Sequence, residues 1–222
     1  MFHADTYQHI QDEIERLAPQ RDVTLVGVTK YATLPDMESA YKAGLRHFGE
    51  NRLDVALPKI EHFSKQGIHD IQWHFIGHLQ RKKVPKLASH FTAIHSVNTV
   101  ELAEKLHQTA QKLILKRAVF LQVNIANETQ KSGFTAEQLD DVLPHIQQQC
   151  PTLLIEGLMA MLPKGCSAEQ AAHWYGKCHS LNRQYGFQKL STGMTQDYSI
   201  ALKHGATHIR IGRALFSSEE SE

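Results

Sequence analysis

The sequence predicts an α/β fold: a single-domain (β/α)8 barrel of the TIM type, with an extra N-terminal helix. Short apolar runs alternate with amphipathic stretches along nearly the whole chain. No linker or change in composition divides the 222 residues, a length that suits one barrel, so the predicted domain spans 1–222. No GxGxxG motif follows the first apolar run, which disfavours the alternative of a doubly wound open sheet.

The apolar runs give eight predicted strands, and the amphipathic stretches give the helices between them. The strands are expected at 23–29, 45–49, 71–77, 91–97, 118–125, 153–161, 189–193 and 207–211. The helices are expected at 5–18, 34–43, 51–65, 81–89, 98–115, 135–149, 168–186 and 195–204. The first crossover has the clearest signals, because Thr33 can cap its helix, Pro35 and Asp36 suit the first turn and Gly44 can end it.

Lys30 directly follows the first predicted strand, where a barrel of this type places its chemistry. Residues 23–28 are five apolar residues and a threonine, which indicates a strand buried on both faces. The Lys30 amine could stay charged and bind phosphate, or lose its proton and form a Schiff base with an aldehyde. The structural alternative is a lysine that only extends its charged end from a strand into water.

A pattern typical of an anion site follows the last two predicted strands. Small residues around Gly193 and Gly212 let backbone N–H groups approach a phosphate. Arg210 or Arg213 adds positive charge there, and the helix expected after Thr195 would direct its positive end to the same place. Barrels often bind phosphate after strands seven and eight. Together with the lysine of strand one, the pattern favours a site for a phosphorylated carbonyl compound over the alternative of tight turns with solvated arginines.

The composition argues against several partners. The chain has 24 basic and 23 acidic residues, so neither nucleic acid nor an anionic membrane is an expected partner. No apolar run is long enough to span a membrane, and the first residues form no secretory signal pattern. Three cysteines without a CxxC motif indicate free thiols and a cytoplasmic protein. The 15 histidines lack the spacing of metal ligands, so no metal is expected.

Nine motifs, in family order across nearly the whole chain, resemble those of the pyridoxal 5′-phosphate (PLP) homeostasis family, the YggS/PROSC group. They are Val28-Thr29-Lys30, Phe48-Gly49-Glu50-Asn51, Trp73-His74-Phe75-Ile76-Gly77-His78-Leu79-Gln80, His95-Ser96-Val97, Gln122-Val123-Asn124-Ile125, Lys131-Ser132-Gly133, Glu156-Gly157-Leu158-Met159, Leu190-Ser191-Thr192-Gly193-Met194-Thr195-Gln196-Asp197 and Ile209-Arg210-Ile211-Gly212. Proteins of this family look like the barrel domain of fold-type III PLP enzymes such as alanine racemase.

The resemblance implies which residues hold PLP. Lys30 would carry the cofactor as an internal aldimine. The phosphate would be held by residues from the last two strand ends, namely Ser191, Met194, Thr195, Gly212 and Arg213.

For the rest of the cofactor, the resemblance implies that Arg210 faces the pyridine nitrogen and keeps it unprotonated. Asn51 and His74 would line the ring pocket, although either could instead satisfy backbone groups at a strand end. Lys131 matches a family lysine near the mouth, with a solvated loop charge as the alternative. One departure is Ala32, because many relatives carry a second lysine there; any secondary role of that lysine in handling the cofactor is therefore in doubt.

Three functions remain in competition. The favoured one is a non-catalytic PLP-binding protein that buffers, carries or delivers the cofactor, with apo PLP-dependent enzymes as its partners. A fold-type III racemase or decarboxylase would add a second domain, and the chain ends soon after its eighth predicted strand, which also favours a monomer. An aldolase barrel that uses a Schiff base without PLP typically carries its lysine on a later strand.

Overall fold

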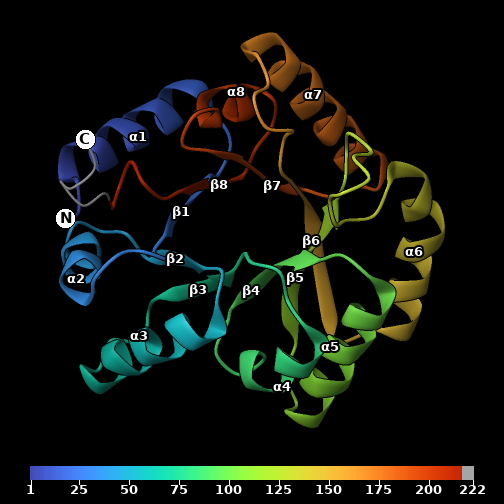
Figure 1. Cartoon of the computed structure of the whole chain (residues 1–222), viewed down its shortest axis with the longest axis horizontal. Helices are drawn as coiled ribbons and strands as arrows, with labels where there is room; N and C mark the ends of the chain where they lie inside the picture. The colour runs from blue at the N-terminus through green and yellow to red at the C-terminus, as the bar shows by residue number, and fades with distance from the viewer. Residues whose placement is uncertain (217–222) are drawn as a thin grey trace.

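The chain forms a closed barrel of eight parallel strands, with the helices outside it (Figure 1). In this computed structural model residues 1–216 are described, so positions 217–222 of the predicted domain lie outside the described residues. The strands are β1 (Thr24–Val28), β2 (His47–Glu50), β3 (Gln72–Phe75), β4 (Ala93–Val97), β5 (Arg117–Val123), β6 (Leu153–Ala160), β7 (Lys189–Met194) and β8 (His208–Ile211). Each strand pairs with the next, and β1 pairs with β8 to close the ring. The predicted (β/α)8 barrel is confirmed.

The helices follow the predicted order. They are α1 (Ala4–Leu17), α2 (Leu34–Lys42), α3 (Leu53–Lys65), α4 (Val84–Leu87), α5 (Val100–Lys112), α6 (Ala136–Gln149), α7 (Ala168–Gln184) and α8 (Tyr198–Lys203). The extra helix α1 lies beside α8 (Figure 1), where the Tyr198 hydroxyl donates to the Glu13 carboxylate at 2.6 Å. It therefore covers the outside of the barrel near the β1–β8 closure.

Local signals explain where the helices begin. At α2, Thr33 and Asp36 form a reciprocal capping box, and Gly44 follows the helix with φ of +104°, a conformation that favours glycine. Thr135 and Gln138 form a capping box at α6, and at α5 the Thr99 hydroxyl accepts the Leu102 N–H. These residues place the start of each crossover helix shortly after the strand that leads into it.

Three helices are at least four residues shorter than predicted, and one of them is α5, Val100–Lys112, expected at 98–115. The stretch expected at 81–89 divides into a 3₁₀ turn, Arg81–Lys83, and the four-residue helix α4. The helix expected at 195–204 begins only at Tyr198, because the Asp197 carboxylate accepts the Met194 N–H at 2.6 Å and holds residues 194–197 in a turn.

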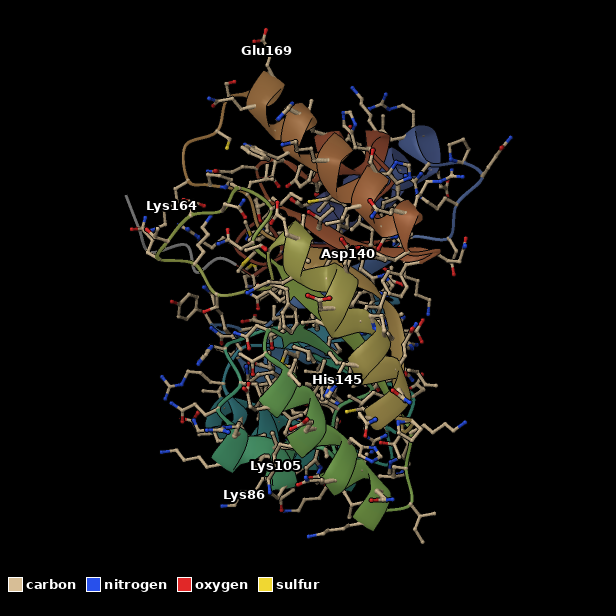
Figure 2. The ribbon with its side chains drawn as sticks, turned by 90° about the vertical axis from the view of Figure 1, so that its right-hand side faces the viewer. Lys86, Lys105, Asp140, His145, Lys164 and Glu169 are labelled. Atoms are coloured by element: carbon tan, nitrogen blue, oxygen red, sulfur yellow. The ribbon has the colours of Figure 1, made fainter. Side chains whose placement is uncertain are left out.

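The main apolar core lies between the strands and the surrounding helices, whereas only a small apolar cluster of Ala93, Phe120 and Met159 forms a separate group. Helices α5 and α6 lie side by side (Figure 2). His145 of α6 lies 3.3 Å from the Glu104 carboxylate of α5. The polar side chains of His74, His95, Ser191 and Arg210 also lie in the barrel interior, in contrast to the branched apolar side chains that usually fill such barrels.

None of the helices in residues 1–216 has both the length and the apolar character that a membrane span requires. The same residues contain no group of three or more His, Cys, Asp or Glu side chains arranged to hold a metal ion.

Candidate functional site

The first part of the candidate site is Lys30, which follows β1 at the C-terminal mouth of the barrel. Its side chain is exposed, with Nζ 4.7 Å from the centre of the Tyr31 ring. The preceding residue, Thr29, is fully buried and donates its N–H to the Gly49 carbonyl at 3.0 Å. The backbone that carries Lys30 is therefore fixed while its amine is free to move.

A buried ion pair between Lys59 and Glu50 holds Thr29, the residue before Lys30. The Nζ of Lys59, on α3, donates to Glu50 Oε1 and to the Thr29 carbonyl, each at 2.6 Å. The Thr29 hydroxyl donates to the same Glu50 oxygen at 2.6 Å. Glu50 is fully buried and Lys59 is 8% exposed, so both charges depend on each other for solvation. This network connects β2 and α3 to the residue just before Lys30.

Asn51, predicted to line a ring pocket, follows β2 and is half-buried. The backbone of Gly77, which follows β3, packs directly on it: a Cβ on Gly77 would lie 2.1 Å from the Asn51 carbonyl oxygen. This contact requires glycine and brings the ends of β2 and β3 together at the mouth.

The predicted phosphate segments expose unused backbone donors. The N–H groups of Thr195, Gly212 and Arg213 donate no hydrogen bond to any of the described residues. Arg213 is exposed and has no ion-pair partner within residues 1–216. Met194 differs, because its N–H is already bonded to Asp197. Three unused donors beside an unpaired cation have the composition of an anion site.

The strand register brings these segments next to Lys30. Gly27 in β1 lies opposite Ile211 in β8, and Met194 in β7 lies opposite Arg210. A Cβ on Gly212 would lie 3.5 Å from Val28 Cβ, an ordinary contact two residues before the lysine. The structure therefore assembles the ends of β1, β7 and β8 into one mouth, as the sequence predicted.

Arg210 lies inside the barrel wall rather than at its surface, with 5% of its area exposed. Its guanidinium donates to Ser191 Oγ at 2.8 Å and to the Ala160 carbonyl at 3.2 Å. Among residues 1–216 no carboxylate forms an ion pair with it, and Asp197 acts only at longer range. Burial lowers the pKa of Arg210, yet a guanidinium stays charged at neutral pH. It is a buried cation that the protein does not neutralise.

Ser191 and His74 also lie inside the barrel. The Ser191 hydroxyl is committed to Arg210 and to His95 Nδ1, at 2.8 Å each. His74 uses both ring nitrogens on other histidines, His95 and His47, at 2.9 Å each. His74 also lines a cavity of about 500 Å³ at the N-terminal mouth, so the structure does not bring its ring together with Lys30.

The interior histidines are neutral. Burial lowers the pKa of His74 and of His95 well below the ordinary value and lowers that of His208 to about 3. Burial also lowers the pKa of His47, which is only partly enclosed. Each ring therefore donates through one nitrogen and accepts through the other.

Lys131 lies near the C-terminal mouth but is not free. Its Nζ donates to the Leu162 carbonyl at 2.9 Å and pairs with Glu128 at 2.5 Å. It also lines a cavity of about 240 Å³ between the ends of β3 and β5. Its predicted position near the mouth agrees with this location.

Sequence reasoning did not single out the ion pair of Lys59 or the role of His95. A signal existed for Lys59, because it shares the buried face of α3 with Ala56 and Phe63, at helical spacing. A charged residue on an apolar face indicates a buried partner. For His95, strand alternation places it on the same face of β4 as Ala93, but no local feature names its partner.

The comparisons with known proteins agree with this architecture. The model of the family described as alanine racemase, N-terminal domain, matches residues 3–220. A pyridoxal phosphate homeostasis protein of Synechocystis is 40% identical, over 97% of this chain and 98% of that protein. The protein of the same name in Escherichia coli K12 is 30% identical, over 98% of this chain and 97% of its own length.

Solved structures extend the likeness. PipY of Synechococcus elongatus with PLP bound is 31% identical and superposes with a TM-score of 0.83, over 94% of this chain and 100% of that one. An alanine racemase of Clostridium difficile is 14% identical, with a TM-score of 0.70, over 98% of this chain and 58% of that enzyme, a likeness of fold alone.

Proposed function

The chain belongs to the family of pyridoxal phosphate homeostasis proteins, and on this premise we propose that it binds PLP and buffers, carries or delivers it without turning over a substrate. The observation that carries the proposal is the identity to the Synechocystis relative along nearly the full length of both chains. PipY with PLP bound supports the choice of cofactor. The recipients that we propose are apo forms of PLP-dependent enzymes.

The mouth of the barrel fits a phosphorylated ligand. The unused N–H groups of Thr195, Gly212 and Arg213 supply donors, and the Arg213 side chain supplies charge. Met194 flanks these donors, whereas the Ser191 hydroxyl is already bonded to Arg210 and to His95. We assign the phosphate to this group of backbone donors.

Lys30 is the residue that we propose for covalent attachment. When bound, PLP supplies an aldehyde for an amine to attack and a ring that can withdraw electrons. The Lys30 amine is exposed and lies two residues after Val28, which is the neighbour of Gly212, while the Glu50–Lys59 pair holds the backbone before it. Asn51, at the adjoining end of β2, would face the ring from the other side of the mouth.

Arg210 is the residue that we propose for the ring nitrogen. A buried guanidinium donates hydrogen bonds and accepts no proton, so it holds the nitrogen in its unprotonated form. An unprotonated ring withdraws electrons weakly and stabilises a substrate carbanion poorly. This property supports storage or transfer of the cofactor over amino-acid chemistry.

The test is a titration of the apo protein with PLP, followed by borohydride reduction and mass spectrometry of the peptides. We expect one equivalent fixed on Lys30 and none in Lys30→Ala. Lys86→Ala, which removes an exposed lysine of α4 (Figure 2), is the matched control and should bind like the unmodified protein. A stable adduct on another lysine in Lys30→Ala would exclude the assignment.

The alternative function, a fold-type III PLP enzyme such as an amino-acid racemase, predicts a different result. The loaded protein incubated with single amino acids would then show steady racemisation, decarboxylation or transamination that Lys30→Ala abolishes. Our proposal predicts no such turnover and transfer of PLP to an apo-enzyme instead.

The compartment and oligomeric state belong to the same proposal. We infer a cytoplasmic location, since Cys150, Cys166 and Cys178 are all free thiols. The expected monomer stays a prediction, which the molar mass from light scattering checks.

A further inference from the structure

A continuous row of hydrogen bonds crosses the interior of the barrel. It runs from Arg210 to Ser191 Oγ at 2.8 Å, from Ser191 Oγ to His95 Nδ1 at 2.8 Å, from His95 Nε2 to His74 Nδ1 at 2.9 Å and from His74 Nε2 to His47 Nδ1 at 2.9 Å. We call these five side chains the interior row. It connects the cation proposed for the cofactor ring with the cavity at the N-terminal mouth, which His47 lines.

The direction of every hydrogen bond in the interior row follows from Arg210. A guanidinium only donates, so Ser191 Oγ accepts from Arg210. Among residues 1–216 its hydroxyl proton has no acceptor other than His95 Nδ1, so the buried hydroxyl is satisfied when it donates to that nitrogen. His95 must then carry its proton on Nε2 and donate it to His74 Nδ1. By the same step His74 is protonated on Nε2 and donates to His47.

Packing holds the central ring of the interior row in place. The His95 ring is fully buried and stacks on Phe120, with ring centres 4.4 Å apart and planes at 28°. A ring turned by 180° would keep this stack but lose the hydrogen bonds of both nitrogens, to Ser191 and to His74, so Nδ1 stays directed at Ser191. Ser191 then presents its lone pair to Arg210 rather than its proton.

We propose that His95, supported by His74 and His47, is a positioning residue for Arg210: it fixes the Ser191 hydroxyl so that the guanidinium is held toward the cofactor ring. This role rests on the proposed PLP binding. It explains how a buried arginine keeps a single orientation without a carboxylate, which would neutralise the charge that the ring nitrogen meets. His95 acts on the ring only through Ser191 and Arg210.

The first experiment needs no cofactor. In the apo protein with ¹⁵N-labelled histidine, long-range ¹H–¹⁵N NMR spectra identify the tautomer of each ring. We expect His95, His74 and His47 all to be protonated on Nε2 only. A proton on Nδ1 of His95 or His74 would contradict the proposed hydrogen-bond directions in the interior row, whether or not the protein binds PLP.

The second experiment reads the cofactor environment. His95→Phe keeps an aromatic ring on Phe120 but removes the acceptor for Ser191, and we expect a shifted absorption maximum of bound PLP and roughly tenfold weaker binding. His95→Asn places a carbonyl oxygen near the position of Nδ1, so it should restore the spectrum of the unmodified protein. The matched control is His208→Phe, because His208 is also buried, with 8% of its area exposed, and packs on Phe120 at 5.0 Å without a hydrogen bond to the interior row.

The outcomes distinguish the proposed PLP binding from the proposed positioning role of His95. An unmodified protein that binds no PLP removes the proposed function and leaves the NMR result standing. PLP spectra that are identical in His95→Phe and the unmodified protein overturn the positioning role. Equal spectral shifts in His95→Phe and His208→Phe do the same, because the effect would then be general packing.

Discussion

Within residues 1–216 two lysine or arginine side chains are buried, Lys59 and Arg210, and their surroundings differ. Lys59, between α3 and the ends of β1 and β2, is paired with the fully buried Glu50 at 2.6 Å. Arg210, inside the barrel, meets only the neutral oxygens of Ser191 and Ala160. Lys59 and its carboxylate hold the backbone before Lys30, whereas Arg210 keeps a positive charge that no carboxylate of the described residues neutralises.

The difference indicates which cation is structural. A buried charge with an oppositely charged partner has part of its lost solvation replaced within the fold and is neutralised without a ligand. A buried charge surrounded by neutral groups is held at a cost and can still attract a ligand. The comparison therefore supports the Glu50–Lys59 pair as a fold element and Arg210 as part of the candidate site.

The largest change in the free energy of unfolding should come from acid, which protonates the neutral histidines of the barrel interior around Arg210. The pKa values of His74, His95 and His208 are lowered in the folded state, so below about pH 6.5 the unfolded chain binds protons that the folded protein does not. Stability is full above that pH and falls as the pH drops, by up to about 1.4 kcal/mol per pH unit for each histidine. Urea unfolding at pH 7.5, 6 and 5 measures the loss.

A single variant measures the contribution of His208 to the loss of stability in acid. His208→Phe removes the group whose folded pKa is about 3, and it should make the decline between pH 6.5 and 5 shallower by about 2 kcal/mol. A decline of unchanged slope in His208→Phe would assign the acid sensitivity to other groups.

The second largest loss of stability should come from removing Lys59 from its ion pair. Lys59→Met leaves the Glu50 carboxylate buried without its partner, so we expect the free energy of unfolding to fall by about 3–5 kcal/mol. Lys65→Met, on the same helix, removes an exposed lysine paired with Glu61 and should change stability by less than about 1 kcal/mol. Equal losses in both variants would mean that the buried pair adds nothing beyond a surface pair.

A carboxylate introduced at Gly212, two residues after Arg210, tests whether this part of the mouth binds the phosphate. A side chain at Gly212 meets Val28 at ordinary contact distance, so Gly212→Asp should fold while its charge repels a phosphate on the neighbouring N–H groups. We expect roughly 100-fold weaker PLP binding by calorimetry, from a repulsion of a few kcal/mol.

Two further variants separate charge from size at the same place. Gly212→Asn has the same shape without the charge and should weaken binding much less. Thr195→Ala keeps the backbone donor and should also have a smaller effect than Gly212→Asp. Unchanged or tighter binding by Gly212→Asp would place the phosphate elsewhere.

The smallest change in stability should come from the unpaired cation. Arg210→Met removes a desolvated charge and leaves only neutral oxygens without a donor, so the unfolding free energy of the apo protein should change by no more than about 1 kcal/mol. The same substitution at Lys59 is the control. A loss as large as that of Lys59→Met would show that Arg210 is structural.

Local patterns predicted most of the fold. The alternation of apolar and amphipathic stretches gave all eight strands, and Thr33, Thr99 and Thr135 mark helix starts as expected. The errors lie where a side chain overrides the pattern, as when Asp197 bonds the Met194 N–H and delays α8. In the candidate site, the strand ends predicted to converge are adjacent, and the interior location of His74 was not foreseen.

The sequence by itself determined the order of the strands, the caps of the helices and the position of Lys30 after the first strand, since each depends on residues within a few positions of one another. Only the tertiary structure decided which buried cation received a carboxylate and which way the interior row points. His95 and Ser191 are 96 positions apart in the chain, yet their side chains meet at 2.8 Å because the barrel closes. A hydrogen bond of that kind depends on distance in space, and no local periodicity records it.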